Sequence, residues 1–134
     1  MFYKMIENKC KEWYSSDQCT VRNLIEYIEK TGQMRDAQIE AIKVYLFLKI
    51  GCECKPLEFL FRYGCFNSIN LNDIELSTAT REYLEENPAA TALFEYSRLT
   101  NDKGEQVSEK LEKQIKKDPS SIDYDAFFRT AFYG

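Results

Sequence analysis

Residues 35–51 read RDAQIEAIKVYLFLKIG and indicate the fold class of this chain. In the first half, apolar and charged side chains follow the three- to four-residue spacing of an amphipathic helix. The second half, VYLFLKI, is apolar nearly all round, which is typical of a helix that is buried on every face. A buried β-strand is the competing interpretation, because Val, Tyr, Phe and Ile favour strands. The helical pattern that leads into this stretch favours a central helix over residues 35–50, ending at Gly51.

Helix signals recur on both sides of this segment. Thr20, Ser77 and Asp123 are residues of the kind that caps helix N-termini, and Gly32 stands where a left-handed glycine ends a helix. The remaining helices are expected over residues 2–14, 21–31, 56–63, 78–86, 88–99, 105–117 and 124–132. Residues 65–76 lack a helical period and are expected to form a loop, with a short strand pair as the alternative.

Length and composition indicate a globular domain. The chain has 134 residues, and aromatic residues make up 14% of them, which is enough to build a packed core. We expect a single all-α domain over residues 1–134, an irregular bundle of about six to eight helices with a flexible break near residues 100–104. The aromatic helix at the C-terminal end must pack against a core, either its own or a neighbour's.

The charge of the chain argues against a free-standing nucleic-acid binder. The formal net charge is -4, whereas phosphate binding depends on clustered Lys and Arg. Four lysines do cluster within residues 105–117, but glutamates alternate with them. The pairs Glu109–Lys113 and Glu112–Lys116 therefore predict a solvated, ion-paired helix face.

The chain has no pattern for secretion or membrane insertion. Its first residues carry charges throughout, and its longest apolar run is too short to span a bilayer. Five cysteines, an odd number, argue against a disulfide framework. We therefore predict a cytoplasmic protein that does not act at a membrane.

The residues that most enzymes need are missing. The sequence has no histidine, which is the commonest general base and zinc ligand. The motifs G-x-x-x-x-G-K-[ST], G-x-G-x-x-G, G-x-S-x-G and H-E-x-x-H do not occur. Asp123 and Asp125 could form an acid–base pair, but helix capping and surface charge explain them more simply. We expect no catalysis by the isolated chain.

Three cysteines lie close together in the sequence, at Cys52, Cys54 and Cys65. Structural zinc sites usually have four ligands in paired Cys-x2-4-Cys elements, and this spacing does not supply them. We therefore expect small buried apolar thiols rather than a metal site.

The segment GQMRDAQIEAI, residues 32–42, resembles the glutamine motif that opens the ATPase core of superfamily 2 helicases, including DEAD/DEAH-type enzymes and restriction-type translocases. The family pattern is Leu-Arg-x-x-Gln-x-x-Ala-Ile. The matching positions here are Met34 in place of leucine, Arg35, Gln38, Ala41 and Ile42. In the family, the glutamine amide pairs with the adenine edge, for which a carboxamide offers both a donor and an acceptor. The resemblance implies that Gln38 contacts the adenine of ATP and that Arg35 shapes this pocket.

The wider chain, with its ending DYDAFFRTAFYG, is similar to the helical N-terminal portion of large helicases from bacterial mobile elements and phage-defence loci. The resemblance implies an accessory domain that adds an ATP contact and docks on a motor domain, with nucleic acid bound by the larger assembly. In the family, a Walker A loop follows soon after the glutamine motif, and none does so here. Either the chain is a truncated N-terminal domain, or it is a complete small acidic binding protein, such as a phage-type inhibitor or adaptor.

Overall fold

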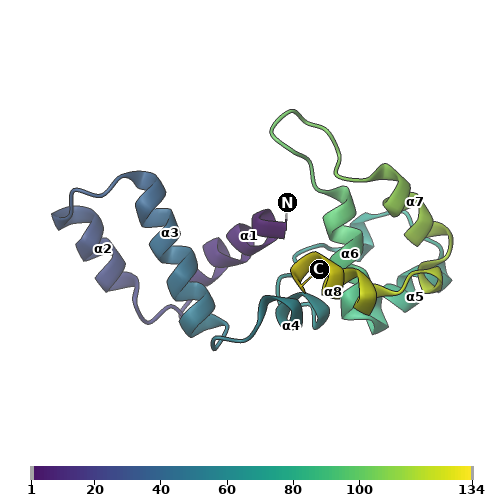
Figure 1. The fold of residues 1–134 in the computed structure, drawn as a ribbon, viewed down its shortest axis with the longest axis horizontal. Helices are drawn as coiled ribbons and strands as arrows, with labels where there is room; N and C mark the ends of the chain where they lie inside the picture. The colour runs from purple at the N-terminus through teal and green to yellow at the C-terminus, as the bar shows by residue number, and fades with distance from the viewer. Residues whose placement is uncertain (1, 134) are drawn as a thin grey trace. The chain divides into compact units, whose positions relative to one another are not determined.

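The computed structural model describes residues 2–133 and is built from α-helices (Figure 1). The α-helices in the described residues are α1 (Phe2–Tyr14), α2 (Arg22–Thr31), α3 (Asp36–Leu46), α4 (Leu57–Arg62), α5 (Thr78–Glu86), α6 (Pro88–Arg98), α7 (Glu109–Lys117) and α8 (Tyr124–Tyr133). The shorter turns are the π-helix η1 (Phe47–Gly51) and the 3-10 helices η2 (Leu71–Asp73) and η3 (Pro119–Ser121). Within residues 2–133, β-type pairing is limited to one isolated bridge between Thr100 and Gln106. The predicted all-α class is confirmed.

The chain divides into two compact units. Unit 1 contains the first turn of α1, up to Met5, and the chain from Pro56 onward, whereas unit 2 spans Ile6–Lys55. Helix α1 therefore contributes residues to both units. The single domain predicted over residues 1–134 stays a prediction.

Helix α6 is the buried centre of unit 1. Pro88 occupies its first turn, where a missing backbone N–H costs nothing. Leu93 and Phe94 are 0% exposed, and α4, α5, α7 and α8 all pack against this helix. Alanines at positions 90 and 92, also fully buried, let the neighbouring helices approach closely. Sequence patterning placed the centre in residues 35–50 instead.

The aromatic helix α8 completes the core of unit 1 rather than a neighbour's. Phe128 is 0% exposed, and the ring of Phe132 stacks on Phe61 of α4 with centroids 5.3 Å apart. Phe2, in the first turn of α1, stacks on Tyr96 at 4.0 Å. These rings explain why the C-terminal segment is so rich in aromatic residues: they fill one contiguous apolar cluster.

The stretch VYLFLKI is not buried on every face, so the prediction of a central helix is wrong. Val44 and Phe47 are buried, but Tyr45 is 59% exposed and Ile50 43%. Unit 2 contributes only α2, most of α1 and α3 itself, which is too few helices to surround an apolar segment. Apolar composition shows which side chains can be buried, but not how many neighbours exist to cover them.

The α-helical turn changes to a π-helical one over Phe47–Gly51, where the chain packs against Trp13. The rings of Trp13 and Phe47 lie 5.5 Å apart. A Cβ at Gly51 would lie 2.9 Å from Phe47 Cδ1 and 3.0 Å from Trp13 Nε1. Gly51, predicted as the helix end, is the last residue of the π-helix. The close approach of the Phe47 ring and the Trp13 indole leaves no room for a side chain at this position.

Two of the predicted helix caps differ from the structure in detail, although α2 ends before Gly32 as predicted. Gly32 ends α2 with φ -85°, not in the left-handed conformation, but a Cβ there would lie 2.7 Å from the Ile28 carbonyl oxygen. Thr20 does not cap α2, since the N-cap residue is Val21 and no side chain caps this end. Instead, Arg22 anchors the start of α2 by donating to the carbonyl oxygens of Tyr14, at the end of α1, and of Ser16 in the loop that follows.

The segments that connect the helices of unit 1 are held by local hydrogen bonds. Residues 65–76, for which a strand pair was the alternative, contain the turn η2 and no strand. Around residues 100–104, the Asn101 side-chain oxygen accepts hydrogen bonds from the backbone N–H groups of Lys103 and Glu105. Because of this turn, α7 begins at Glu109, after its N-cap Ser108, and not at residue 105 as predicted. The flexibility expected there stays a prediction.

Candidate functional site

The structure brings Arg35 and Gln38 together at the N-terminus of α3. Arg35 is the N-cap residue, and its backbone N–H donates to Gln38 Oε1 at 2.9 Å. The Gln38 backbone N–H donates to the Arg35 carbonyl oxygen, also at 2.9 Å. This is the glutamine half of a capping box, which satisfies backbone groups that the helix leaves open. The side chains of both residues are exposed.

The other matched positions lie along the same helix. Met34 is 48% exposed, Ala41 is also exposed, and Ile42 is half-buried. The glutamine oxygen that would face adenine is already the acceptor of the capping hydrogen bond. Any adenine contact from this oxygen must therefore share it with the Arg35 N–H.

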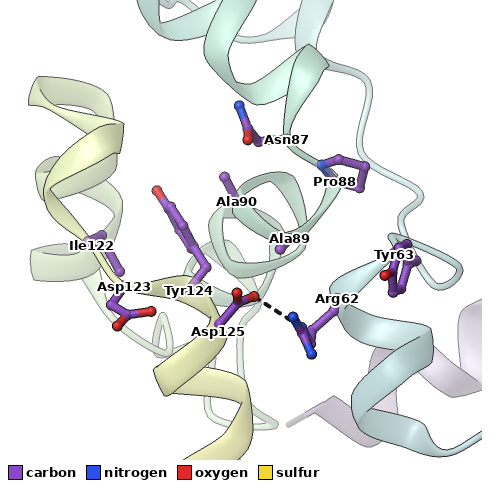
Figure 2. A pocket seen from close by; sticks show the side chains of 10 residues that line it. All are labelled: Arg62, Tyr63, Asn87, Pro88, Ala89, Ala90, Ile122, Asp123, Tyr124 and Asp125. Carbon is purple, nitrogen blue, oxygen red and sulfur yellow. Dashed lines mark hydrogen bonds and ion pairs between the residues drawn. The ribbon is translucent and has the colours of Figure 1, made fainter.

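A pocket of about 300 Å³ opens on unit 1 (Figure 2). Three stretches of chain line it: residues 62–63 at the end of α4, residues 87–90 at the start of α6, and residues 122–125 at the start of α8. Two helix N-termini and one helix C-terminus therefore meet around the same cavity. Sequence reasoning missed this site, because its three stretches are far apart in the chain and each reads as an ordinary helix end.

The floor of the pocket is apolar and includes the half-buried Ala89. Ala90 is 0% and Tyr124 8% exposed, and Ile122 is half-buried. The Tyr124 hydroxyl donates to the Pro119 carbonyl oxygen at 2.6 Å. Burial, together with the nearby Tyr83 and Asp118, raises the pKa of Tyr124, so its hydroxyl stays a hydrogen-bond donor at neutral pH.

Carboxylates stand at the rim of the pocket. Asp123 caps α8 by accepting the Ala126 N–H at 3.0 Å, as predicted for a residue at this position. Figure 2 shows Asp125 on the other side of Tyr124, joined to Arg62. Both aspartates are exposed, so their remaining oxygens are open to a ligand.

Arg62 is held at the rim by two acidic side chains. Its Nε lies 3.0 Å from Asp125 Oδ1, and its Nη1 lies 3.1 Å from Glu58 Oε1. Desolvation lowers the pKa of Arg62, but the charges of Asp125 and Glu58 outweigh it and raise the pKa overall. Among the residues that line the pocket, the two carboxylates of Asp123 and Asp125 outnumber the single guanidinium, and the rim is acidic.

The acidic rim lies in the more acidic of the two units. In the sequence, unit 1 carries 14 Asp and Glu against 10 Lys and Arg, whereas unit 2 carries 8 of each. The whole negative charge of the chain, -4, therefore belongs to unit 1. Beside the rim, the Tyr63 ring is 62% exposed and adds an aromatic surface to the pocket wall.

The thiols divide into protected and accessible groups. Cys10 and Cys19 are buried, Cys52 is intermediate, and Cys54 and Cys65 are exposed. The prediction of small buried thiols is therefore wrong for Cys54 and Cys65. In the part of the chain that the structure describes, no group of three or more Cys, Asp and Glu residues is placed to hold a metal ion.

The lysine-rich helix α7 forms one of its two predicted ion pairs. Lys116 Nζ lies 3.9 Å from Glu112 Oε2, and Glu112 also pairs with Arg98. Burial raises the pKa of Glu112, but hydrogen bonds from Gln106 and Arg98 and the charge of Lys116 lower it overall. The predicted pair of Glu109 with Lys113 is not formed among residues 2–133.

Among the described helices, none combines the length and the apolar content that crossing a bilayer requires. Comparison of the chain with known protein families, with curated proteins and with solved structures finds no match in any of the three.

Proposed function

We propose that this chain is a protein-binding module whose pocket in unit 1 receives a basic side chain of a partner protein. The observation that carries the proposal is the combination of an apolar floor, at Ala89 and Ile122, with the exposed carboxylates of Asp123 and Asp125 at the rim. Lysine and arginine side chains match this arrangement, because each has an aliphatic stem that ends in a cationic group. The stem would lie on the floor and the head would meet the carboxylates.

Two further features support a cationic ligand. The exposed Tyr63 ring borders the pocket and offers its face to a cation. The excess of acidic residues in unit 1 attracts basic surfaces before contact and raises the rate of association. An acidic, helical binding protein of the inhibitor or adaptor type is the function that these features favour.

The proposal can be tested by titrating the 15N-labelled chain with acetyl-Gly-Arg-Gly-amide, with acetyl-Gly-Gln-Gly-amide as the neutral control. We expect the arginine peptide to shift the amide signals of residues 87, 89, 90 and 122–126 at concentrations where the glutamine peptide does not. If the two peptides shift these signals equally, or neither shifts them, the pocket does not select a basic side chain.

Asp123→Asn is the variant that isolates the charge. Asparagine caps helix N-termini as well as aspartate does, so α8 keeps its cap while the rim loses a carboxylate. We expect the affinity for the arginine peptide to fall about two- to fivefold, as for an exposed ion pair worth about 0.5–1 kcal/mol. Asp73→Asn, at an exposed aspartate in η2 outside the pocket lining, is the matched control and should leave the affinity unchanged.

The glutamine motif supports a second proposal, a helicase-associated role in which Gln38 contacts the adenine of ATP within a longer chain that carries a motor domain and binds nucleic acid. Its support is the exposed position of Gln38 and Arg35 at the start of α3. Gln38→Glu is the informative change, because glutamate keeps an oxygen for the Arg35 N–H but loses the amide donor. ATP affinity of the longer chain should fall with Gln38→Glu and not with Gln114→Glu; equal affinities would remove the adenine role.

We further propose that the protein works in the cytoplasm. Two of the five cysteines, Cys54 and Cys65, are exposed thiols. Exposed thiols persist in a reducing compartment and are oxidised or paired in an oxidising one. Fractionation of the cells that produce the protein, with antibodies against the chain, would test this location.

A further inference from the structure

The turn that follows the π-helix η1 has an unusual backbone. Glu53 has φ 57° and Cys54 has φ 60°, so two successive residues other than glycine are left-handed. The Cys52 N–H donates to the Phe47 carbonyl oxygen at 2.9 Å, and the Cys54 N–H donates to the Leu48 carbonyl oxygen at 3.1 Å. The end of the π-helix therefore holds the turn in a conformation that side chains normally disfavour.

This conformation sets the separation of the two cysteines that flank Glu53. A left-handed residue places its two neighbours as the mirror image of an α-helix does, with Cα atoms about 5.4 Å apart. Disulfides join cysteines whose Cα atoms lie about 4.4–6.8 Å apart. An extended Glu53 would place them farther apart, so the left-handed turn brings Cys52 and Cys54 into the range of a disulfide.

The two thiols also differ in solvent exposure, so that an external disulfide reacts with one before the other. Cys54 is exposed and its thiol donates to the Lys49 carbonyl oxygen at 3.4 Å, whereas Cys52 is half-buried. The other two cysteines of unit 2, Cys10 and Cys19, are buried. Small reagents therefore reach Cys54 first, and Cys52 is the thiol next to it in the chain.

We propose that Cys52 and Cys54 form a redox-active dithiol, which low-molecular-weight disulfides such as oxidised glutathione convert to an intramolecular disulfide. This site is independent of the basic-ligand pocket, which lies in unit 1.

The exchange balances in two steps. The Cys54 thiolate attacks one sulfur of oxidised glutathione, its S–S bond breaks, and one glutathione thiolate leaves, so that Cys54 carries a mixed disulfide. The Cys52 thiolate then attacks the Cys54 sulfur and releases the second glutathione thiolate. Each protein thiol has lost one proton, the protein has lost two electrons, and one oxidised glutathione has become two reduced ones.

The test is to incubate the reduced full chain with oxidised glutathione and to follow its intact mass and its peptide map. We expect the wild-type chain to form a bond that maps to Cys52 and Cys54, with little glutathione retained on Cys54 and a mixed disulfide on the exposed Cys65. In Cys52→Ser the second step is blocked, so the mixed disulfide should accumulate on Cys54. Cys65→Ser, which removes the other exposed thiol, should form the Cys52–Cys54 bond as the wild type does.

Two results would overturn the proposal. One is a wild-type chain that retains glutathione on Cys54 to the same extent as Cys52→Ser, because Cys52 would then not resolve the mixed disulfide. The other is a disulfide that joins Cys54 to Cys65, or two chains to each other.

Discussion

Unit 1 and unit 2 hold their helices together by different means. In unit 1, the rings of Phe61, Phe66 and Phe128 are all 0% exposed, as is Phe94 of the central helix α6. In unit 2, Ile25 is the one apolar residue that reaches 0%, and a lysine joins the helices instead. Unit 1 also has ion pairs between its helices, Arg62–Asp125 and Arg98–Glu112, but they add to a large apolar core. In unit 2 the apolar core is smaller, so the polar contacts carry a larger share of the stability.

The polar contacts of unit 2 centre on Lys43 of α3. Its Nζ lies 3.4 Å from Glu29 of α2, 3.4 Å from Glu40 and 4.5 Å from the centroid of the Tyr14 ring in α1. One side chain therefore touches all three helices of this unit. The stability of unit 2 should therefore respond to charge, pH and salt, whereas the stability of unit 1 should depend mainly on apolar packing.

The largest effect should come from the core of unit 1. Phe128→Ala removes a fully buried ring of α8 and leaves a cavity, which should destabilise the unit by about 3–5 kcal/mol. Urea unfolding followed by circular dichroism measures this loss. Tyr133→Ala, on the same helix but 67% exposed, should change the free energy of unfolding by less than about 0.5 kcal/mol. Equal losses in the two variants would contradict the assignment of the core.

A rise in pH from 9 to 11 should lower the free energy of unfolding of unit 2 by an intermediate amount. Burial raises the pKa of the Cys10 thiol from 9.0 to about 11, and the nearby Glu40 adds to the shift. The folded state therefore holds this proton more tightly than the unfolded state. The protonated Cys10 thiol therefore contributes about 2–3 kcal/mol to the free energy of unfolding. This contribution is complete below pH 9 and is lost as the pH rises through 11.

Trp13 makes this loss measurable. It is the single tryptophan of the chain and lies in unit 2, so its fluorescence reports the unfolding of that unit. The urea midpoint should fall between pH 9 and 11 in the wild type and fall less in Cys10→Ala, which has no thiol to ionise. Cys65→Ala serves as the control, because this exposed thiol lies in unit 1. The prediction is wrong if Cys10→Ala keeps the full alkaline loss.

The smallest effect should come from the charge that joins the helices of unit 2. Desolvation lowers the pKa of Lys43, but Glu40 and Glu29 raise it overall, so the ion pairs outweigh the cost of burial. Lys43→Met keeps much of the stem and removes the charge, which should cost about 0.5–1 kcal/mol at low salt and less at high salt. Lys30→Met, at an exposed lysine of α2, is the control. A loss that high salt leaves unchanged would show that packing, not charge, is the contribution of Lys43.

Local signals predicted the helix ends of unit 1 well. Ser77 and Asp123 both accept backbone N–H groups as N-caps, and Pro88 begins α6. These features depend on a few adjacent residues, so short patterns identify them. The candidate pocket does not depend on adjacent residues. The ion pair of Arg62 with Asp125 joins positions 63 apart in the sequence, and no pattern of spacing connects them.

The sequence by itself determined the helical class, most helix positions and the absence of histidine and of phosphate-binding loops, because composition, caps and periodicity are local properties. Only the tertiary structure decided which helix is central. The apolar VYLFLKI stretch is partly exposed, whereas α6, with its alanines, is buried, because burial depends on how many neighbours surround a segment. The acidic pocket and the left-handed turn between Cys52 and Cys54 arise in the same way, from contacts that the folded chain creates between separated residues.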